Sequence, residues 1–191
     1  MSKSSGSRQL LVIHHSHTDI GYTAPQAIIE RYHVDFIRQA LRIVESDVSR
    51  QFKWTCETFW GVERFLAAAS DSGRARFRQA VRDRRIGLSG SYLNFNELLD
   101  LPVLSEMTGR AQAFGDSIGV PVEAAMTADI NGFGWGFARA LLDHDIKNLF
   151  TCIHTHHGMF PLGRRHVGFW WETPGGERLL VWSGEHYHYG N

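Results

Sequence analysis

The chain has 191 residues, of which 43% are hydrophobic and 12% aromatic, enough to bury the core of one domain or of part of a larger one. Lysine plus arginine and aspartate plus glutamate both count 20, so the formal net charge is zero and no overall field would attract nucleic acid or an anionic membrane. We therefore expect a disordered tail at residues 1–9, one folded unit at residues 10–191, and a neutral partner.

The amino-terminal segment gives no sign of export. Its apolar run at residues 10–13 is much shorter than a signal-peptide core or a membrane span, and Cys56 and Cys152 are too few for a disulfide framework. These features predict a cytoplasmic protein. The eleven histidines are a high count for this length, and most lie in three short clusters, which suggests that a metal is bound.

Short strand-like runs alternate with amphipathic helical stretches along the chain. This alternation is typical of α/β folds in which parallel strands close into a barrel or form an open doubly wound sheet. Both place reactive side chains at the carboxyl ends of the strands. In chain order, we expect a strand at 10–14, a helix at 25–45, a strand at 52–55, helices at 60–69 and 75–84 with a break at Gly73, a strand at 86–89, a helix at 104–118, a strand at 124–127, a helix at 135–144 and a strand at 148–152.

The carboxyl-terminal part of the chain has a different pattern. Residues 167–171 and 178–182 read as strands, and a turn lies between them at residues 173–176, so we expect a β-hairpin added after the alternating units. No linker, repeat or low-complexity stretch divides the chain.

The strongest local signal is the segment HHSHTDIGY at residues 14–22, directly after the first predicted strand. Alternate residues of an extended segment point to the same side, so His15, His17 and Asp19 would share one side. Imidazole and carboxylate groups together suit a borderline cation such as zinc. A polar strand end with hydrogen-bonded histidines would produce the same spacing, so the residues alone leave both interpretations open.

A second signal is Asp129, which follows the fourth predicted strand. An acidic residue there would face the same rim as His17 and Asp19. Asp129 could instead be a helix N-cap or a turn residue beside the Asn-Gly pair that follows it. The Gly-rich turn after Asp129 lacks both the GxGxxG and the Walker patterns of phosphate-binding loops.

Further polar side chains follow the other predicted strands. Each could line the same site or form loop hydrogen bonds only, and the sequence does not decide between these roles. They are Glu57 after the second strand, Asn94, Asn96 and Glu97 after the third, and His154, His156 and His157 after the fifth.

Taken together, the HxHxDxGY pattern at residues 15–22 and an aspartate near the Gly-Phe-Gly turn at residues 132–134 resemble the motifs of glycoside hydrolase family 38. The segment FKWTCE at residues 52–57 is similar to the family's F.W..E segment, and SGSYLNFNE at residues 89–97 is similar to its GGW…NDE loop. The Trp-rich hairpin at residues 169–182 also resembles a strand pair of the family. The similarity covers nearly the whole chain, and the order and spacing of the motifs make it specific.

The resemblance implies an α/β fold of the parallel β/α barrel type, with seven strands in the family, of which this chain would hold only the first part. It also implies that one zinc ion is bound by His17, Asp19 and Asp129, and that Asp129 is the catalytic nucleophile. Tyr22 matches a position at which an aromatic ring stacks on the bound sugar. The other substrate-binding residues expected on this basis are Glu57, Phe133 and Trp135.

Two features depart from the family pattern. The family usually has Pro-Phe-Gly-His directly after the nucleophile, whereas residues 130–135 of this chain read INGFGW, with inserted residues before Phe133. The family also takes a fourth zinc ligand, a histidine, and its general acid/base, an aspartate, from well beyond the equivalent of residue 191. We therefore expect the sequence to be a fragment of the catalytic domain.

The implied activity is that of a retaining α-mannosidase, which hydrolyses terminal α-mannosyl linkages of a mannoside or oligosaccharide through a covalent glycosyl-enzyme. Two alternatives stay open. His15-x-His17 after a first barrel strand also resembles metal-dependent amidohydrolases, and an aromatic rim without catalysis would make a non-catalytic sugar-binding fragment. A barrel cut after five strands would leave sheet edges unpaired, which predicts self-association into homo-oligomers.

Overall fold

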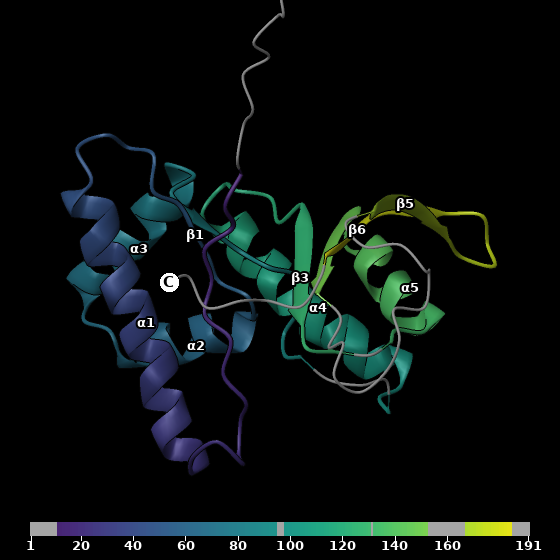
Figure 1. Ribbon diagram of the computed structural model, residues 1–191, viewed down its shortest axis with the longest axis horizontal. Helices are drawn as coiled ribbons and strands as arrows, with labels where there is room; N and C mark the ends of the chain where they lie inside the picture. Colours follow the sequence, from purple (N-terminus) through teal and green to yellow (C-terminus); the bar gives the residue numbers. More distant parts are fainter. Residues whose placement is uncertain (1–10, 95–97, 131, 153–166, 185–191) are drawn as a thin grey trace, which may run out of the picture.

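The computed structural model describes residues 11–94, 98–130, 132–152 and 167–184. The predicted tail at residues 1–9, Asn96, Glu97 and the histidines at 154, 156 and 157 lie outside this range. In chain order the elements are α1 (Gln26–Ser46), β1 (Trp54–Thr55), α2 (Phe59–Ala68), α3 (Asp71–Arg82), β2 (Ile86–Gly87), α4 (Leu101–Ser117), β3 (Ala124–Ala128), α5 (Trp135–Asp143), β4 (Asn148–Cys152), β5 (Val167–Glu172) and β6 (Arg178–Gly184), as drawn in Figure 1.

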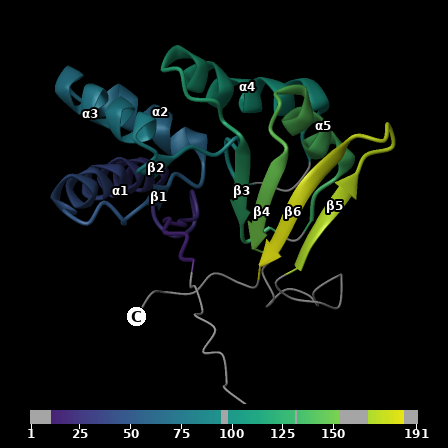
Figure 2. The same cartoon turned by 90° about the horizontal axis from the view of Figure 1, so that it is seen from above.

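The strands form two sheets. β1 and β2 pair in parallel, and a second sheet has the order β3-β4-β6-β5, in which only β5 is antiparallel to its neighbour. In Figure 2, the arrowheads of β3, β4 and β6 point to the same side of the molecule. The parallel pairing and the late hairpin of β5 and β6 therefore confirm the predicted topology of these segments.

Ser89 and Gly90 join the two sheets. The backbone N–H of Met126 in β3 donates to Ser89 Oγ at 2.9 Å, and the N–H of Gly90 donates to the Ala124 carbonyl at 3.0 Å. These contacts place the end of β2 beside β3, so the strands of both sheets lie next to one another in one curved series. Within the described residues this series is open, and no closed barrel is formed.

The helices divide into two groups. Helices α1, α2 and α3 lie beside β1 and β2, whereas α4 and α5 lie beside the four-stranded sheet (Figure 2). Phe77 of α3 packs against Phe65 of α2 with ring centroids 5.2 Å apart, and Leu141 of α5 is fully buried. A single cluster of buried apolar side chains includes residues of both groups, and burial of this kind is the main stabilising term of the fold.

The first predicted strand, at residues 10–14, is wrong for the residues that the structure describes. Residues 11–19 have irregular backbone, although the His14 carbonyl accepts a hydrogen bond from the Thr55 N–H of β1 at 2.8 Å. A single such bond places the segment beside β1 but does not make the repeated ladder that defines a strand. The residues that precede α1 therefore depend on side-chain contacts for their position.

Helix capping corrects two further predictions. Gly73 does not break the chain between two helices, because it lies inside α3, whose N-cap is Ser70 with a side chain that accepts from the Gly73 N–H at 3.3 Å. Helix α4 begins three residues before its predicted start, since Asp100 caps it by accepting from the Val103 N–H at 3.2 Å. Both results follow the preference for Ser and Asp at N-caps.

The β5–β6 hairpin exposes apolar side chains on one face. Trp170 is 61% exposed and Trp182 46% exposed, and Gly168 pairs with Trp182 across the two strands. The self-association expected from unpaired sheet edges stays a prediction. Among the described residues, no helix combines the length and the apolar character that crossing a bilayer requires.

Candidate metal centre

Side chains from four separate segments meet at the carboxyl ends of the parallel strands. His17 belongs to the irregular segment before α1, Glu57 follows β1, Asn94 follows β2, and Asp129 is the first residue after β3. Parallel strands bring their carboxyl ends to one edge of a sheet. The predicted convergence of the first and fourth segments is therefore what the structure has.

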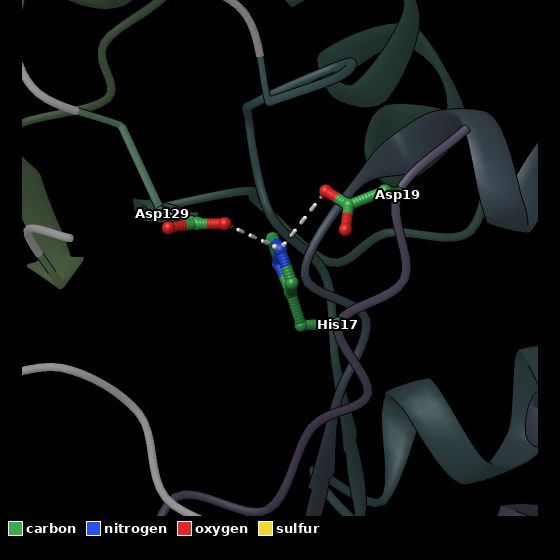
Figure 3. Close-up of side chains that lie close together, drawn as sticks. All are labelled: His17, Asp19 and Asp129. Atoms are coloured by element: carbon green, nitrogen blue, oxygen red, sulfur yellow. Dashed lines mark ion pairs between the residues drawn. The ribbon is translucent and has the colours of Figure 1, made fainter. Parts of the chain in front are cut away.

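His17, Asp19 and Asp129 form a compact group of potential metal ligands (Figure 3). His17 Nε2 lies 3.8 Å from Asp19 Oδ1 and 3.7 Å from Asp129 Oδ2, and one donor atom from each residue lies within 4.8 Å of the others. Donors that bind a tetrahedral zinc ion at about 2.1 Å lie about 3.4 Å apart. One imidazole nitrogen and two carboxylates at these separations fit such an ion with little adjustment.

The backbone of Asp129 has an unusual conformation. Its φ is 61°, in the left-handed region that costs a non-glycine residue about 1–2 kcal/mol and that aspartate tolerates better than most. Its N–H donates to the Cys152 carbonyl of β4 at 3.0 Å, which fixes this conformation at the end of β3. The alternative that Asp129 caps a helix is wrong, because the N-cap of α5 is Gly134.

Glu57 is a buried carboxylate that contacts two histidines. It is only 5% exposed, and its two oxygens lie 2.5 Å from His15 Nδ1 and 2.7 Å from His17 Nδ1. Burial by itself would raise the pKa of Glu57, but the hydrogen bonds from the two imidazoles outweigh burial and lower the pKa to about 2. The two imidazole contacts therefore favour the anionic form of Glu57.

His17 responds to the same charges. Burial by itself would lower the pKa of His17, but the hydrogen bond to Glu57 and the negative charges of Glu57, Asp19 and Asp129 raise it above the ordinary histidine value. The same concentration of negative charge that favours a proton on His17 would also favour a bound cation. His15, by contrast, does not belong to the group of potential ligands found among the described residues.

A cavity of about 350 Å³ adjoins two of the potential metal ligands, His17 and Asp19. Tyr22 lies at its rim with 80% of its surface exposed, and a hydrogen bond to Asp19 raises the pKa of its phenol to about 12. The lining described for this cavity comprises His17, Thr18, Asp19, Ile20, Tyr22, His33, Glu57, Thr58, Leu93 and Asn94. A cavity lined by both polar and apolar side chains beside a candidate cation site is suited to a ligand that carries hydroxyl groups.

Two of the predicted substrate-binding residues, Tyr22 and Glu57, line this cavity, whereas Phe133 and Trp135 do not belong to its described lining. Phe133 packs inward, with its ring centroid 5.4 Å from that of Phe137 and 6.4 Å from that of Trp171. Trp135 begins α5 and is 58% exposed. The three aromatic side chains thus lie in different places: Tyr22 at the cavity rim, Phe133 against the core, and Trp135 exposed at the start of α5.

His33 was not predicted as a site residue. It lines the cavity from α1 and packs edge-on against Trp60 with ring centroids 5.3 Å apart, and burial lowers the pKa of its imidazole. A lone histidine in a helix has no spacing signal, so only the packing of α1 against α2 could reveal this position.

The fold and the site define an α/β protein with a candidate cation site at the carboxyl ends of parallel strands. The family model described as the glycosyl hydrolases family 38 N-terminal domain matches residues 7–191. The chain therefore belongs to glycoside hydrolase family 38. No curated protein gives a significant match to the sequence.

Solved structures share the fold at low sequence identity. An α-mannosidase from Enterococcus faecalis matches with a TM-score of 0.71 and 14% identity over 90% of this chain. A glycosyl hydrolase family 38 protein from the same organism matches with a TM-score of 0.67 and 12% identity over 89% of this chain. The present chain spans only 19% and 18% of these two proteins.

A third structure extends the likeness to another carbohydrate-active enzyme. The 4-α-glucanotransferase from Thermococcus litoralis matches with a TM-score of 0.60 and 10% identity over 90% of this chain, which spans 27% of that protein. At such identities the likeness concerns the fold, and the chemistry of the site has to be argued from its residues.

Proposed function

We propose that this chain belongs to a retaining, zinc-dependent α-mannosidase and supplies most of its metal ligands and its nucleophile. The observation that best supports this proposal is the convergence of His17, Asp19 and Asp129 from segments more than 100 residues apart on one potential cation site. Membership of glycoside hydrolase family 38 and the likeness to an α-mannosidase agree with it. The proposal also takes the chain as the first part of the family's β/α barrel, which would account for the open series of strands.

In this proposal His17, Asp19 and Asp129 hold one zinc ion. When bound, the ion would supply positive charge that grips two adjacent sugar hydroxyls and favours distortion of the ring toward an oxocarbenium-like transition state. The cavity beside the ligands offers room for such a sugar, and Tyr22 stands at its rim. An exposed phenol ring there can stack on the C–H face of a mannose ring.

Asp129 acts as the nucleophile in the proposed reaction. One carboxylate oxygen forms a bond with the anomeric carbon while the bond from that carbon to the leaving oxygen breaks, and the leaving oxygen takes a proton from an acid. Water then cleaves the glycosyl ester and restores the carboxylate. Retaining enzymes place the acid about 5–5.5 Å from the nucleophile, and the proposal assigns none of the described residues to that role.

The left-handed backbone of Asp129 supports the nucleophile assignment. Strained backbone at a reactive residue persists where the surrounding structure holds it, as the hydrogen bond to Cys152 does here. Glu57 lies at the same cavity but faces the histidines. A substrate-binding role for Phe133 and Trp135 is proposed from the family resemblance alone. Both residues belong to the turn and helix that follow Asp129.

The test is the hydrolysis of an aryl α-mannoside by the full-length protein and two variants. Asp129→Ala should lose at least about 10³-fold in kcat, because it removes the attacking oxygen. Asp145→Ala is a matched control: Asp145 also has a left-handed φ, of 58°, and its side chain is 89% exposed. Appreciable turnover by Asp129→Ala would rule out the nucleophile, and wild-type protein without α-mannosidase activity would rule out the function.

A further inference from the structure

We propose that Glu57 and Asn94 are positioning residues that hold His17 and Asp129 in one fixed arrangement. The inference rests on the proposed metal centre and adds to it two residues that are not themselves metal ligands. Its basis is a continuous chain of hydrogen bonds, which runs from the imidazole of His17 to the backbone directly before Asp129.

Three side-chain nitrogen atoms converge on Glu57. His15 Nδ1 lies 2.5 Å from Oε2, His17 Nδ1 lies 2.7 Å from Oε1, and the Asn94 amide also donates to Oε1. Only a carboxylate accepts on both oxygens and donates from neither. Because a carboxylate with a nitrogen at each oxygen can only accept, both imidazoles carry a proton on Nδ1 in this proposal.

This requirement sets the orientation of His17. With its proton on Nδ1, the ring presents the lone pair of Nε2, and Nε2 is the atom that faces Asp19 and Asp129 at 3.8 and 3.7 Å. A carboxylate behind a ligating imidazole is the usual device that fixes the tautomer and the ring plane at zinc sites. Glu57 thus prepares His17 for a cation.

Asn94 extends the same network to the other side of the site. Its Nδ2 donates to Glu57 Oε1, and its Oδ1 accepts from the Ala128 N–H at 3.3 Å. Ala128 is the last residue of β3, and Asp129 follows it. These two contacts need both a donor and an acceptor at position 94. The Asn94→Asp substitution would therefore not preserve the network, because it removes the donor and places a second carboxylate against Glu57.

His15 completes the arrangement without being a ligand. Its hydrogen bond satisfies the second oxygen of the buried Glu57 carboxylate, and a buried anion without partners would be strongly unfavourable. The two histidines His15 and His17 of the sequence motif therefore have different roles in this proposal. His17 would bind the cation, and His15 would hold the carboxylate that orients His17.

The proposal distinguishes two substitutions of Glu57. In Glu57→Gln, the amide oxygen can still accept from His17 and Asn94 if the amide nitrogen turns toward His15, so only the His15 contact is lost. Glu57→Ala removes all three contacts. We expect zinc affinity to fall by about 10–100-fold in Glu57→Ala, the range typical for residues that orient ligands, by less in Glu57→Gln, and by an intermediate amount in Asn94→Ala.

The experiment uses the full-length protein, with zinc alone as the titrant and circular dichroism to confirm that each variant is folded. Glu63→Gln is the matched control, because Glu63 accepts from the Tyr92 hydroxyl at 2.7 Å and pairs with Arg110 outside the metal group, and it should leave zinc affinity unchanged. A folded Glu57→Ala or Asn94→Ala chain with wild-type zinc affinity would overturn the positioning role while leaving the metal centre intact.

A second readout does not need zinc. In metal-free protein at alkaline pH, ¹⁵N chemical shifts of the imidazoles should show His17 protonated on Nδ1 in the wild type and a mixture of tautomers in Glu57→Ala. Identical tautomers in the two proteins would overturn the inference. If the wild type shows the Nδ1 tautomer but binds no zinc, the proposed function fails and the hydrogen-bond network stands, so the two failures are distinguishable.

Discussion

The two halves of the candidate site are held by different kinds of interaction. His17 and Asp19 lie on irregular backbone, and His17 is positioned by a side-chain hydrogen bond to Glu57. Asp129 lies at the end of a regular strand and is positioned by a backbone hydrogen bond to β4. The first half should therefore be sensitive to the loss of single side chains, and the second to changes in how the strands are aligned.

The largest effects on stability should come from substitutions in the buried core beside each half of the site. Phe77 in α3 and Leu141 in α5 are fully buried, so Phe77→Ala should lower the free energy of unfolding by about 3–5 kcal/mol and Leu141→Ala by about 2–5 kcal/mol. Because one buried cluster includes both residues, each should shift a single thermal transition. Tyr32→Ala, at a residue 46% exposed, is the control. Two separate transitions would show that the halves fold independently.

Metal addition should stabilise the protein by binding both halves at once. At a free zinc concentration of 100 times Kd, the free energy of unfolding should rise by about 2.7 kcal/mol, measured by thermal unfolding with and without a chelator. Asp19→Asn and Asp129→Asn should each reduce this gain, because each removes a charged ligand from a different half. A gain in both variants equal to that of the wild type would place zinc elsewhere.

The seam between the two sheets, formed by Ser89 and Gly90 against β3, should have the next largest effect on stability. Ser89 is 1% exposed, and its Oγ accepts from the Met126 and Ser91 N–H groups at 2.9 and 3.2 Å. Ser89→Ala would leave buried donors without this acceptor and should lower the free energy of unfolding by about 1–3 kcal/mol. Ser117→Ala removes only an exposed hydroxyl that donates to Phe114 and should change denaturant unfolding little. Equal stabilities would contradict the importance of the seam.

The smallest effect concerns an ion pair in the first half, between Asp47 and Arg85, which do not belong to the candidate metal group. Hydrogen bonds from Ser49 and the Phe52 N–H, together with the charge of Arg85, lower the pKa of Asp47. A carboxyl whose pKa is lower in the folded chain stabilises the fold above its unfolded pKa, and this stabilisation is lost as the pH falls through the folded pKa. Asp47→Asn should therefore flatten the acid side of the stability profile, whereas Asp116→Asn, at an exposed position, should not.

Much of the fold could be predicted because its signals are local. The apolar spacing in α1 and α5 predicted both helices to within two residues, and β4 has the predicted bounds, since periodicity and β-branched or aromatic content act over a few residues. Caps were harder. Ser70 and Asp100 moved the starts of α3 and α4 because one side-chain hydrogen bond can decide where a helix begins.

The candidate ligands were expected from the family resemblance, but their supporting network could not be predicted. The alternation of an extended segment grouped His15 with His17 and Asp19 and left a polar strand end as an alternative, and the resemblance to glycoside hydrolase family 38 implied the set His17, Asp19 and Asp129. The partners of Glu57 are 40 and 42 residues away in the sequence, and Asn94 is 37 residues away. No local pattern distinguishes a carboxylate that binds substrate from one that orients histidines.

The sequence by itself thus determined the helices, the parallel strands, the hairpin and the residue types of a cation site, because these depend on periodicity and on the chemistry of short segments. Only the tertiary structure decided that residues 11–14 lie beside β1 without forming a strand, that Phe133 packs inward while Tyr22 stays at the cavity rim, and that His15 and His17 share one carboxylate. These outcomes depend on contacts between distant segments, which exist only once the chain has folded.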